Sequence, residues 1–110
     1  MPSMNISDDK IFYYVQKMMN HLDETNRLQQ LAKDNGIEIK NEIDLSEDNR
    51  KRVAIATTAM LLAKRNGDPD YDMLCRTGLQ KREFKSRVIN KYKDEARQLI
   101  NRVENNISTD

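Results

Sequence analysis

Basic side chains concentrate in one part of this 110-residue chain, and the chemistry that they favour is the binding of anions or acidic surfaces. Residues 76–102 contain nine of them: Arg76, Lys81, Arg82, Lys85, Arg87, Lys91, Lys93, Arg97 and Arg102. The same stretch contains three acids, Glu83, Asp94 and Glu95. Such a stripe can contact phosphate groups or an acidic protein. We therefore take six of its residues as the candidate interaction or nucleic-acid surface: Lys81, Arg82, Lys85, Arg87, Lys91 and Arg97.

The formal net charge of +1 hides an uneven distribution. Residues 1–50 contain 6 Lys and Arg against 10 Asp and Glu, whereas residues 51–110 contain 13 against 8. The front half is therefore acidic and the back half basic. This division suggests that the acidic first helix of one copy, or of a partner, contacts the basic last helix of another.

Few residues are suited to catalysis or metal binding. The chain has one histidine, His21, one cysteine, Cys75, and three glycines, which excludes a His/Cys zinc site within one chain and a Gly-rich phosphate loop. Residues 68–72 resemble the start of a calcium-binding EF-hand loop, but Met73 and Leu79 occupy the positions that require Gly and Glu. We expect no enzyme activity, no catalytic residue, no cofactor and no metal.

The length and composition favour one small domain spanning residues 1–110. Only 37% of the residues are hydrophobic and 34% are charged. Such a composition is typical of long amphipathic helices whose outer faces are solvated, or of a protein that gains stability from a partner. The lone cysteine and the absence of a leader predict a reducing cytoplasm. The apolar run 53–63 is too short to span a membrane, and we expect no small-molecule substrate.

Capping residues mark the ends of the expected helices. Ser7-Asp8-Asp9 and Ser46-Glu47-Asp48 each place a hydroxyl before two acids, which suits the positive end of a helix. Asn35-Gly36 and Asn66-Gly67 are the expected stops, because these residue types tolerate the left-handed conformation. In the first helix the apolar pattern is interrupted at residues 23–26, where we expect a bend or a change of partner.

Between the first two helices, residues 37–45 place isoleucines and a leucine at mostly two-residue spacing. This spacing is typical of a strand, but the sequence offers no second strand to pair with it. We expect an extended connector that packs against the core.

The second helix is apolar on nearly every side between residues 53 and 63, which predicts a central position. Ala56, Ala59 and Ala63 share one narrow face and would allow another helix to approach closely. This predicted helix-contact face is either an internal packing surface or, as the alternative, a dimer seam.

Asp68-Pro69 predicts that a further helix begins at once, because proline suits the first helical position. Gly78 is then either a turn between a short and a long helix or a residue within one unbroken helix, at a cost of about 1 kcal/mol. The last helix shows an apolar stripe, with Lys85 projecting within it and Arg87, Lys91 and Arg97 opposite. The stripe comprises Phe84, Val88, Tyr92, Ala96, Leu99 and Val103, with Ile89 and Ile100 at its edge.

These elements predict an all-α fold. It is a small bundle of three to four helices, with a central Ala-rich helix and a long basic C-terminal helix that ends near Glu104. Residues 1–6 and 105–110 are expected to be loosely ordered.

The segment from Tyr71 to Phe84 resembles a helix-turn-helix, with a short helix, Gly78 at the turn and a polar second helix. The resemblance is partial, because Leu74 and Arg87 replace the small and the aliphatic residues usual in that family. It implies that four residues face the DNA major groove: Gln80, Lys81, Arg82 and Lys85.

A second and looser resemblance covers about the last 55 residues. The Ala-rich helix, the Asp68-Pro69 start and Lys91-Tyr92 in a long basic helix resemble small all-helical proteins of bacteriophages, most of them without an assigned function. This resemblance implies a virion component or an intracellular phage factor, with residues 69–104 as one continuous helix.

The leading functional hypothesis is a non-enzymatic interaction or assembly protein that binds a protein partner or itself. The alternative is a nucleic-acid-binding protein that uses the basic C-terminal helix. Neighbouring acids and the absence of interleaved aromatic residues weigh against this alternative.

Overall fold

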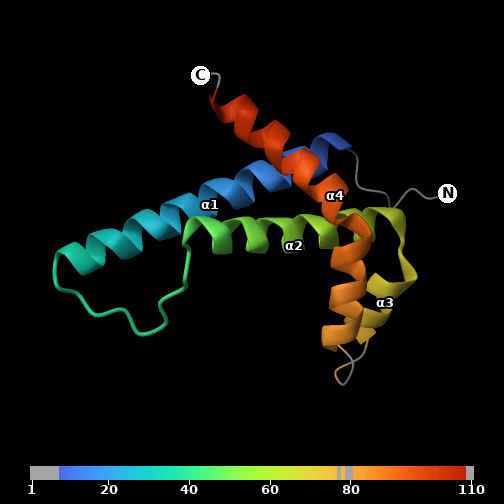
Figure 1. Ribbon diagram of the computed structural model, residues 1–110, viewed down its shortest axis with the longest axis horizontal. Helices are drawn as coiled ribbons and strands as arrows, with labels where there is room; N and C mark the ends of the chain where they lie inside the picture. The colour runs from blue at the N-terminus through green and yellow to red at the C-terminus, as the bar shows by residue number, and fades with distance from the viewer. Residues whose placement is uncertain (1–7, 77, 79–80, 109–110) are drawn as a thin grey trace.

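A computed structural model of the chain describes residues 8–76, 78 and 81–108, and these residues form four α-helices and no strand (Figure 1). The helices are α1 (Asp8–Asp34), α2 (Glu47–Asn66), α3 (Pro69–Arg76) and α4 (Lys81–Ser108). The predicted all-α fold is therefore confirmed.

The helices form two antiparallel pairs, and these pairs pack against each other where α4 crosses α2. α1 and α2 run in opposite directions and are joined by residues 35–46, and α3 runs antiparallel to the first part of α4 (Figure 1). α4 then crosses α2 and reaches the N-terminal part of α1. α2 contacts each of the other three helices, as its predicted central position requires, and α4 does so as well.

The core lies where α1, α2 and α4 meet. Val15, Leu62 and Val103 are fully buried there, one from each helix. Most of the predicted stripe on α4 is buried or half-buried, and Ile100, expected at its edge, is buried as well. Lys85 is exposed, so its ammonium group reaches water.

The predicted helix stops are confirmed. Gly36 and Gly67 have φ of 70° and 64°, the left-handed conformation that ends a helix. The backbone N–H of Ile37 donates to the carbonyl of Ala32 at 2.9 Å, and that of Asp68 donates to Ala63 at 3.0 Å. α2 starts after Ser46 as expected, although the Ser46 side chain makes no capping hydrogen bond.

Gly78 lies between helices, since α3 ends at Arg76 and α4 begins at Lys81. The continuous helix over residues 69–104 that the phage resemblance implied is therefore wrong. Thr77, Leu79 and Gln80 lie outside the described residues, as do the N-terminal residues 1–6 that were expected to be loose. At its other end α4 continues to Ser108, past the expected stop near Glu104.

The connector contradicts the expectation that it packs against the core. Leu45 is buried, but Ile37 and Ile43 are more than half exposed. The physical reason is that α1 extends beyond the start of α2, so the connector lies beside the end of α1 and away from the core where α1, α2 and α4 meet (Figure 1). Along α1 the core residues end at Leu22 and Leu28 is half exposed, so the interrupted pattern at residues 23–26 lies where the helix leaves the packed core.

The molecule is flat and extended. Its principal extents are 52 × 40 × 22 Å, and its radius of gyration is 15.9 Å. A compact domain of this length would have a radius of gyration of about 13 Å. The difference reflects the end of α1 and its connector, which project from the packed body (Figure 1).

Candidate interaction surface

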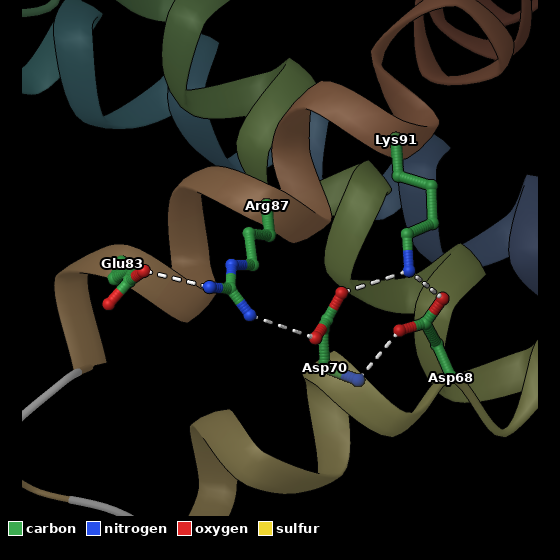
Figure 2. Close-up of polar contacts among 5 residues, drawn as sticks. All are labelled: Asp68, Asp70, Glu83, Arg87 and Lys91. Carbon is green, nitrogen blue, oxygen red and sulfur yellow. Dashed lines mark hydrogen bonds and ion pairs between the residues drawn. The ribbon is translucent and has the colours of Figure 1, made fainter.

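A network of ion pairs fastens α3 to the middle of α4 (Figure 2). The Nζ of Lys91 donates to Oδ2 of Asp68 at 2.8 Å and to Oδ2 of Asp70 at 3.0 Å. The hydroxyl of Tyr92 donates to the same Asp68 oxygen at 2.7 Å. Arg87 bridges Glu83 of its own helix and Asp70 of α3, at 2.8 and 3.8 Å.

Asp68 also caps α3. Its Oδ1 accepts the backbone N–H of Asp70 at 2.8 Å, the interaction expected of an N-cap residue. Burial alone would raise the pKa of Asp68, but the hydrogen bonds from Lys91, Tyr92 and the Asp70 backbone outweigh it and hold this pKa below its ordinary value. The hydrogen bonds to Asp68 and Asp70 raise the pKa of Lys91, which therefore stays protonated as a structural cation.

The network divides the six candidate basic residues. Arg87 and Lys91 are paired with acids of α3 and α4, and Arg97 pairs with Asp94 at 3.3 Å on the exposed surface. Three others, Lys81, Arg82 and Lys85, are exposed and have no ion-pair partner among the described residues. Gln80, which the helix-turn-helix resemblance placed beside them, lies outside the described residues.

A basic groove of about 300 Å³ lies between α2 and α4. Its apolar lining consists of Ile55, Ala56 and Ile89. Four cations and one acid complete the lining: Lys51, Arg52, Lys93, Arg97 and Asp48. The groove combines apolar surface with an excess of positive charge.

Three of the groove cations are available to a ligand. Lys51, Arg52 and Lys93 have no ion-pair partner within the described ranges 8–76, 78 and 81–108. A smaller hollow of about 170 Å³ shares Lys51, Ile55 and Arg97 with the groove and extends it toward Ile100. The apolar lining therefore continues along α4.

A larger hollow of about 420 Å³ between α1, α2 and α4 has a different character. Its Arg65 pairs with Glu95 at 3.2 Å, and its Arg102 lies over the ring of Phe12 at 5.7 Å. Because these cations already have partners inside the molecule, this hollow offers less to an anionic ligand than the basic groove.

The three alanines of the predicted helix-contact face lie at different depths. Ala59 and Ala63 are fully buried, whereas Ala56 is half-buried and lines the basic groove. The small side chain of Ala56 leaves room there.

The distal end of α1 and the connector form a second distinctive surface, residues 24–44, which we call the tip. Four large apolar side chains are at least half exposed there: Leu28 at 50%, Leu31 at 51%, Ile37 at 60% and Ile43 at 53%. Exposed apolar side chains gathered at one end of a small protein are typical of interaction sites.

Polar contacts hold the tip in one conformation. The side chain of Gln29 both donates to the carbonyl of Ile43 at 3.0 Å and accepts its backbone N–H at 2.9 Å. Lys33 forms an ion pair with Glu42 across the same gap. The tip is therefore ordered without burying its isoleucines.

Other features of the described residues point to no chemistry. No group of three or more His, Cys, Asp and Glu side chains there could hold a metal ion. His21 and Cys75 are exposed on α1 and α3. Within the same ranges, no helix is both long and apolar enough to cross a membrane.

Sequence reasoning missed most of the groove. Lys93 was counted in the basic stripe, but Lys51, Arg52 and Ile55 were not taken as site residues. Lys51-Arg52 directly before the apolar run of α2 was an available signal, although its closeness to Lys93 depends on how the helices cross. Nothing in the sequence indicated that isoleucines of the connector would be exposed.

The fold and groove define a small helical protein with a basic surface groove, and comparison with known proteins adds no family to this description. No protein-family model, no curated protein and no solved structure matches the chain.

Proposed function

We propose that this protein is a non-enzymatic interaction protein whose basic groove between α2 and α4 binds an acidic, amphipathic protein segment. The observation that carries this proposal is the groove itself, in which Lys51, Arg52 and Lys93, without ion-pair partners among the described residues, surround an apolar lining. A helix with apolar residues on one face and carboxylates beside them fits such a surface.

The lining of the groove favours protein over nucleic acid as the ligand. Ile55, Ala56 and Ile89 offer aliphatic contact, and no aromatic side chain of the described residues lines the groove for base stacking. Arg87 and Lys91 are already paired with Asp70 and Asp68, which shortens the basic surface that a nucleic-acid backbone could follow.

A peptide titration tests this function. The probe is a fluorescent, Leu- and Glu-rich amphipathic peptide of roughly 20 residues, with a Lys-for-Glu version as control. We expect anisotropy to report micromolar binding of the acidic peptide alone. Arg52→Glu with Lys93→Glu should weaken it roughly tenfold or more, because both cations line the groove.

The matched control is Lys81→Glu with Arg82→Glu, which reverses two exposed charges at the start of α4, outside the groove lining. These changes should leave peptide affinity almost unchanged. Equal binding of the acidic and basic peptides, or equal loss in both double variants, would contradict the proposed function.

A second candidate function is nucleic-acid binding through the start of α4, favoured by the exposed and unpaired Lys81, Arg82 and Lys85. Micromolar binding of random duplex DNA that weakens steeply with salt would support it. The substitutions Lys81→Glu and Arg82→Glu should then abolish that binding. If this variant binds duplex DNA with unchanged affinity, the start of α4 is not the nucleic-acid site.

We also propose a reducing setting, the cytoplasm or a virion assembled there, because the exposed Cys75 has no second cysteine in the chain with which to form a disulfide.

A further inference from the structure

Two surfaces of this molecule are complementary to each other, and this deepens the proposed function, on which it rests. The basic groove carries cations around an apolar lining, and the tip carries exposed apolar side chains with acids between them. We propose that the partner of the groove is the tip of a second copy of this chain.

Charge supports this pairing. The tip contains five acids and three bases, a net charge of −2, whereas four cations and one acid line the groove. The acids of the tip are Glu24, Asp34, Glu38, Glu42 and Asp44, and the bases are Arg27, Lys33 and Lys40.

Pairing within the tip sharpens the contrast. Arg27 and Lys33 are bound to Glu24 and Glu42. Among the described residues this leaves three acids of the tip without an ion pair, Asp34, Glu38 and Asp44, against one base, Lys40. The charge that the tip presents to a partner is therefore negative, which disfavours contact between two tips and favours the groove.

Apolar contact supports the same pairing. Leu31 precedes the turn that ends α1, and Ile37 follows it. The backbone N–H of Ile37 donates to the carbonyl of Ala32, the residue next to Leu31 in the sequence. Docking would cover the half-exposed side chains of Leu31 and Ile37 with the apolar lining of the groove, which includes Ile55 and Ile89.

The contact must form between copies. No residue of the tip lines the groove of its own chain, and α1 holds the tip beyond the start of α2 (Figure 1). Because the two surfaces differ, two arrangements are possible: each of two copies places its tip in the groove of the other in a closed, isologous dimer, or one heterologous contact repeats along an open chain.

Light scattering after gel filtration tests this inference with two charge-reversed variants. The groove variant carries Arg52→Glu and Lys93→Glu, and the tip variant carries Asp34→Lys and Glu38→Lys. The wild-type mass should rise above the 12.9 kDa of one chain as concentration increases. Each variant alone should remain near 12.9 kDa, because its groove and tip then have like charge.

Mixing the two variants should restore association, because each then meets a surface of opposite charge. A single chain with all four substitutions should also associate with itself, which shows that the loss in each variant is not misfolding. The control variant Lys81→Glu with Arg82→Glu should behave as wild type.

Several results would overturn the inference. They are a wild-type mass of 12.9 kDa at every concentration, variants that associate as wild type does, or a mixture that stays monomeric. Duplex DNA binding that the groove variant loses, with wild type monomeric, would assign the groove to nucleic acid instead. A monomer that still binds the acidic peptide would refute self-association and leave the proposed function standing, whereas failure of both would refute both.

Discussion

The Nζ of Lys91 on α4 lies 2.8 Å from Oδ2 of Asp68, the residue that caps α3, and this pair holds the short helix against the long one. Asp68 is 7% exposed, whereas the Lys91 side chain is 43% exposed. Because the carboxylate of Asp68 is removed from water, it depends more strongly on its hydrogen-bond partners than the ammonium group of Lys91 does.

Asp68→Ala should therefore destabilise the protein by about 2 kcal/mol, since it removes the cap of α3 and leaves Lys91 and Tyr92 without their shared acceptor. Urea denaturation measures the change. Asp72→Ala is the control, because its ion pair with Arg76 is exposed, and it should cost under about 0.5 kcal/mol. Equal costs would contradict the role given to Asp68.

The lowered pKa of Asp68 predicts how stability changes with pH. The unfolded chain binds a proton at Asp68 more readily than the folded chain does, so this residue contributes stability above its ordinary pKa. The contribution is lost as pH falls through the lower pKa of the folded state.

Asp68→Asn isolates this effect, because Asn remains a good N-cap residue but cannot ionise. The difference in unfolding free energy between wild type and this variant should be constant above about pH 5 and should shrink below about pH 4. A difference that grows on acidification would show that the sign is wrong.

Gly67 and Gly78 should differ in how well they tolerate substitution by alanine. Gly67 has φ of 64° with open space around it, so Gly67→Ala should cost about 1 kcal/mol from backbone strain alone. Gly78 has no positive φ and no neighbour within 4 Å of an added Cβ. Gly78→Ala should be neutral or stabilise by about 0.5 kcal/mol. Thermal unfolding of the pair checks this, and a larger loss at Gly78 would contradict it.

Thr58 is fully buried on α2, and its hydroxyl has no hydrogen-bond partner in the part of the chain that the structure describes. Thr58→Val replaces this hydroxyl with a methyl group of similar size and should stabilise the protein by about 1 kcal/mol. Chemical denaturation measures the change, with Thr57→Val on the exposed side of the helix as control. Destabilisation by Thr58→Val would mean that the hydroxyl has a partner.

The ends of α1 and α2 and the start of α3 were predictable from sequence because they depend on local chemistry. Gly36 and Gly67 adopt the left-handed conformation that few other residues tolerate, and Pro69, which follows the capping Asp68, suits the first position of a helix. The same local chemistry did not decide whether Gly78 interrupts a helix, because Gly is only mildly unfavourable inside one.

The tip and the groove were not predictable in this way. The spacing of Ile37 and Ile43 indicates an extended chain but not whether another helix lies beneath it, which depends on how far α1 extends past α2. Likewise Arg52 and Lys93 lie 41 positions apart and meet only because α4 crosses α2.

An amide NMR titration of the ¹⁵N-labelled protein tests residue by residue whether the groove is the binding surface. Either the acidic peptide is added or the protein concentration is raised from micromolar to millimolar. With the peptide, the largest shifts should fall on the groove, at Arg52, Ala56 and Lys93. On concentration, the same residues should shift together with Leu31 and Ile37 of the tip. Shifts confined to Lys81 and Arg82, or no shifts in either experiment, would contradict the account.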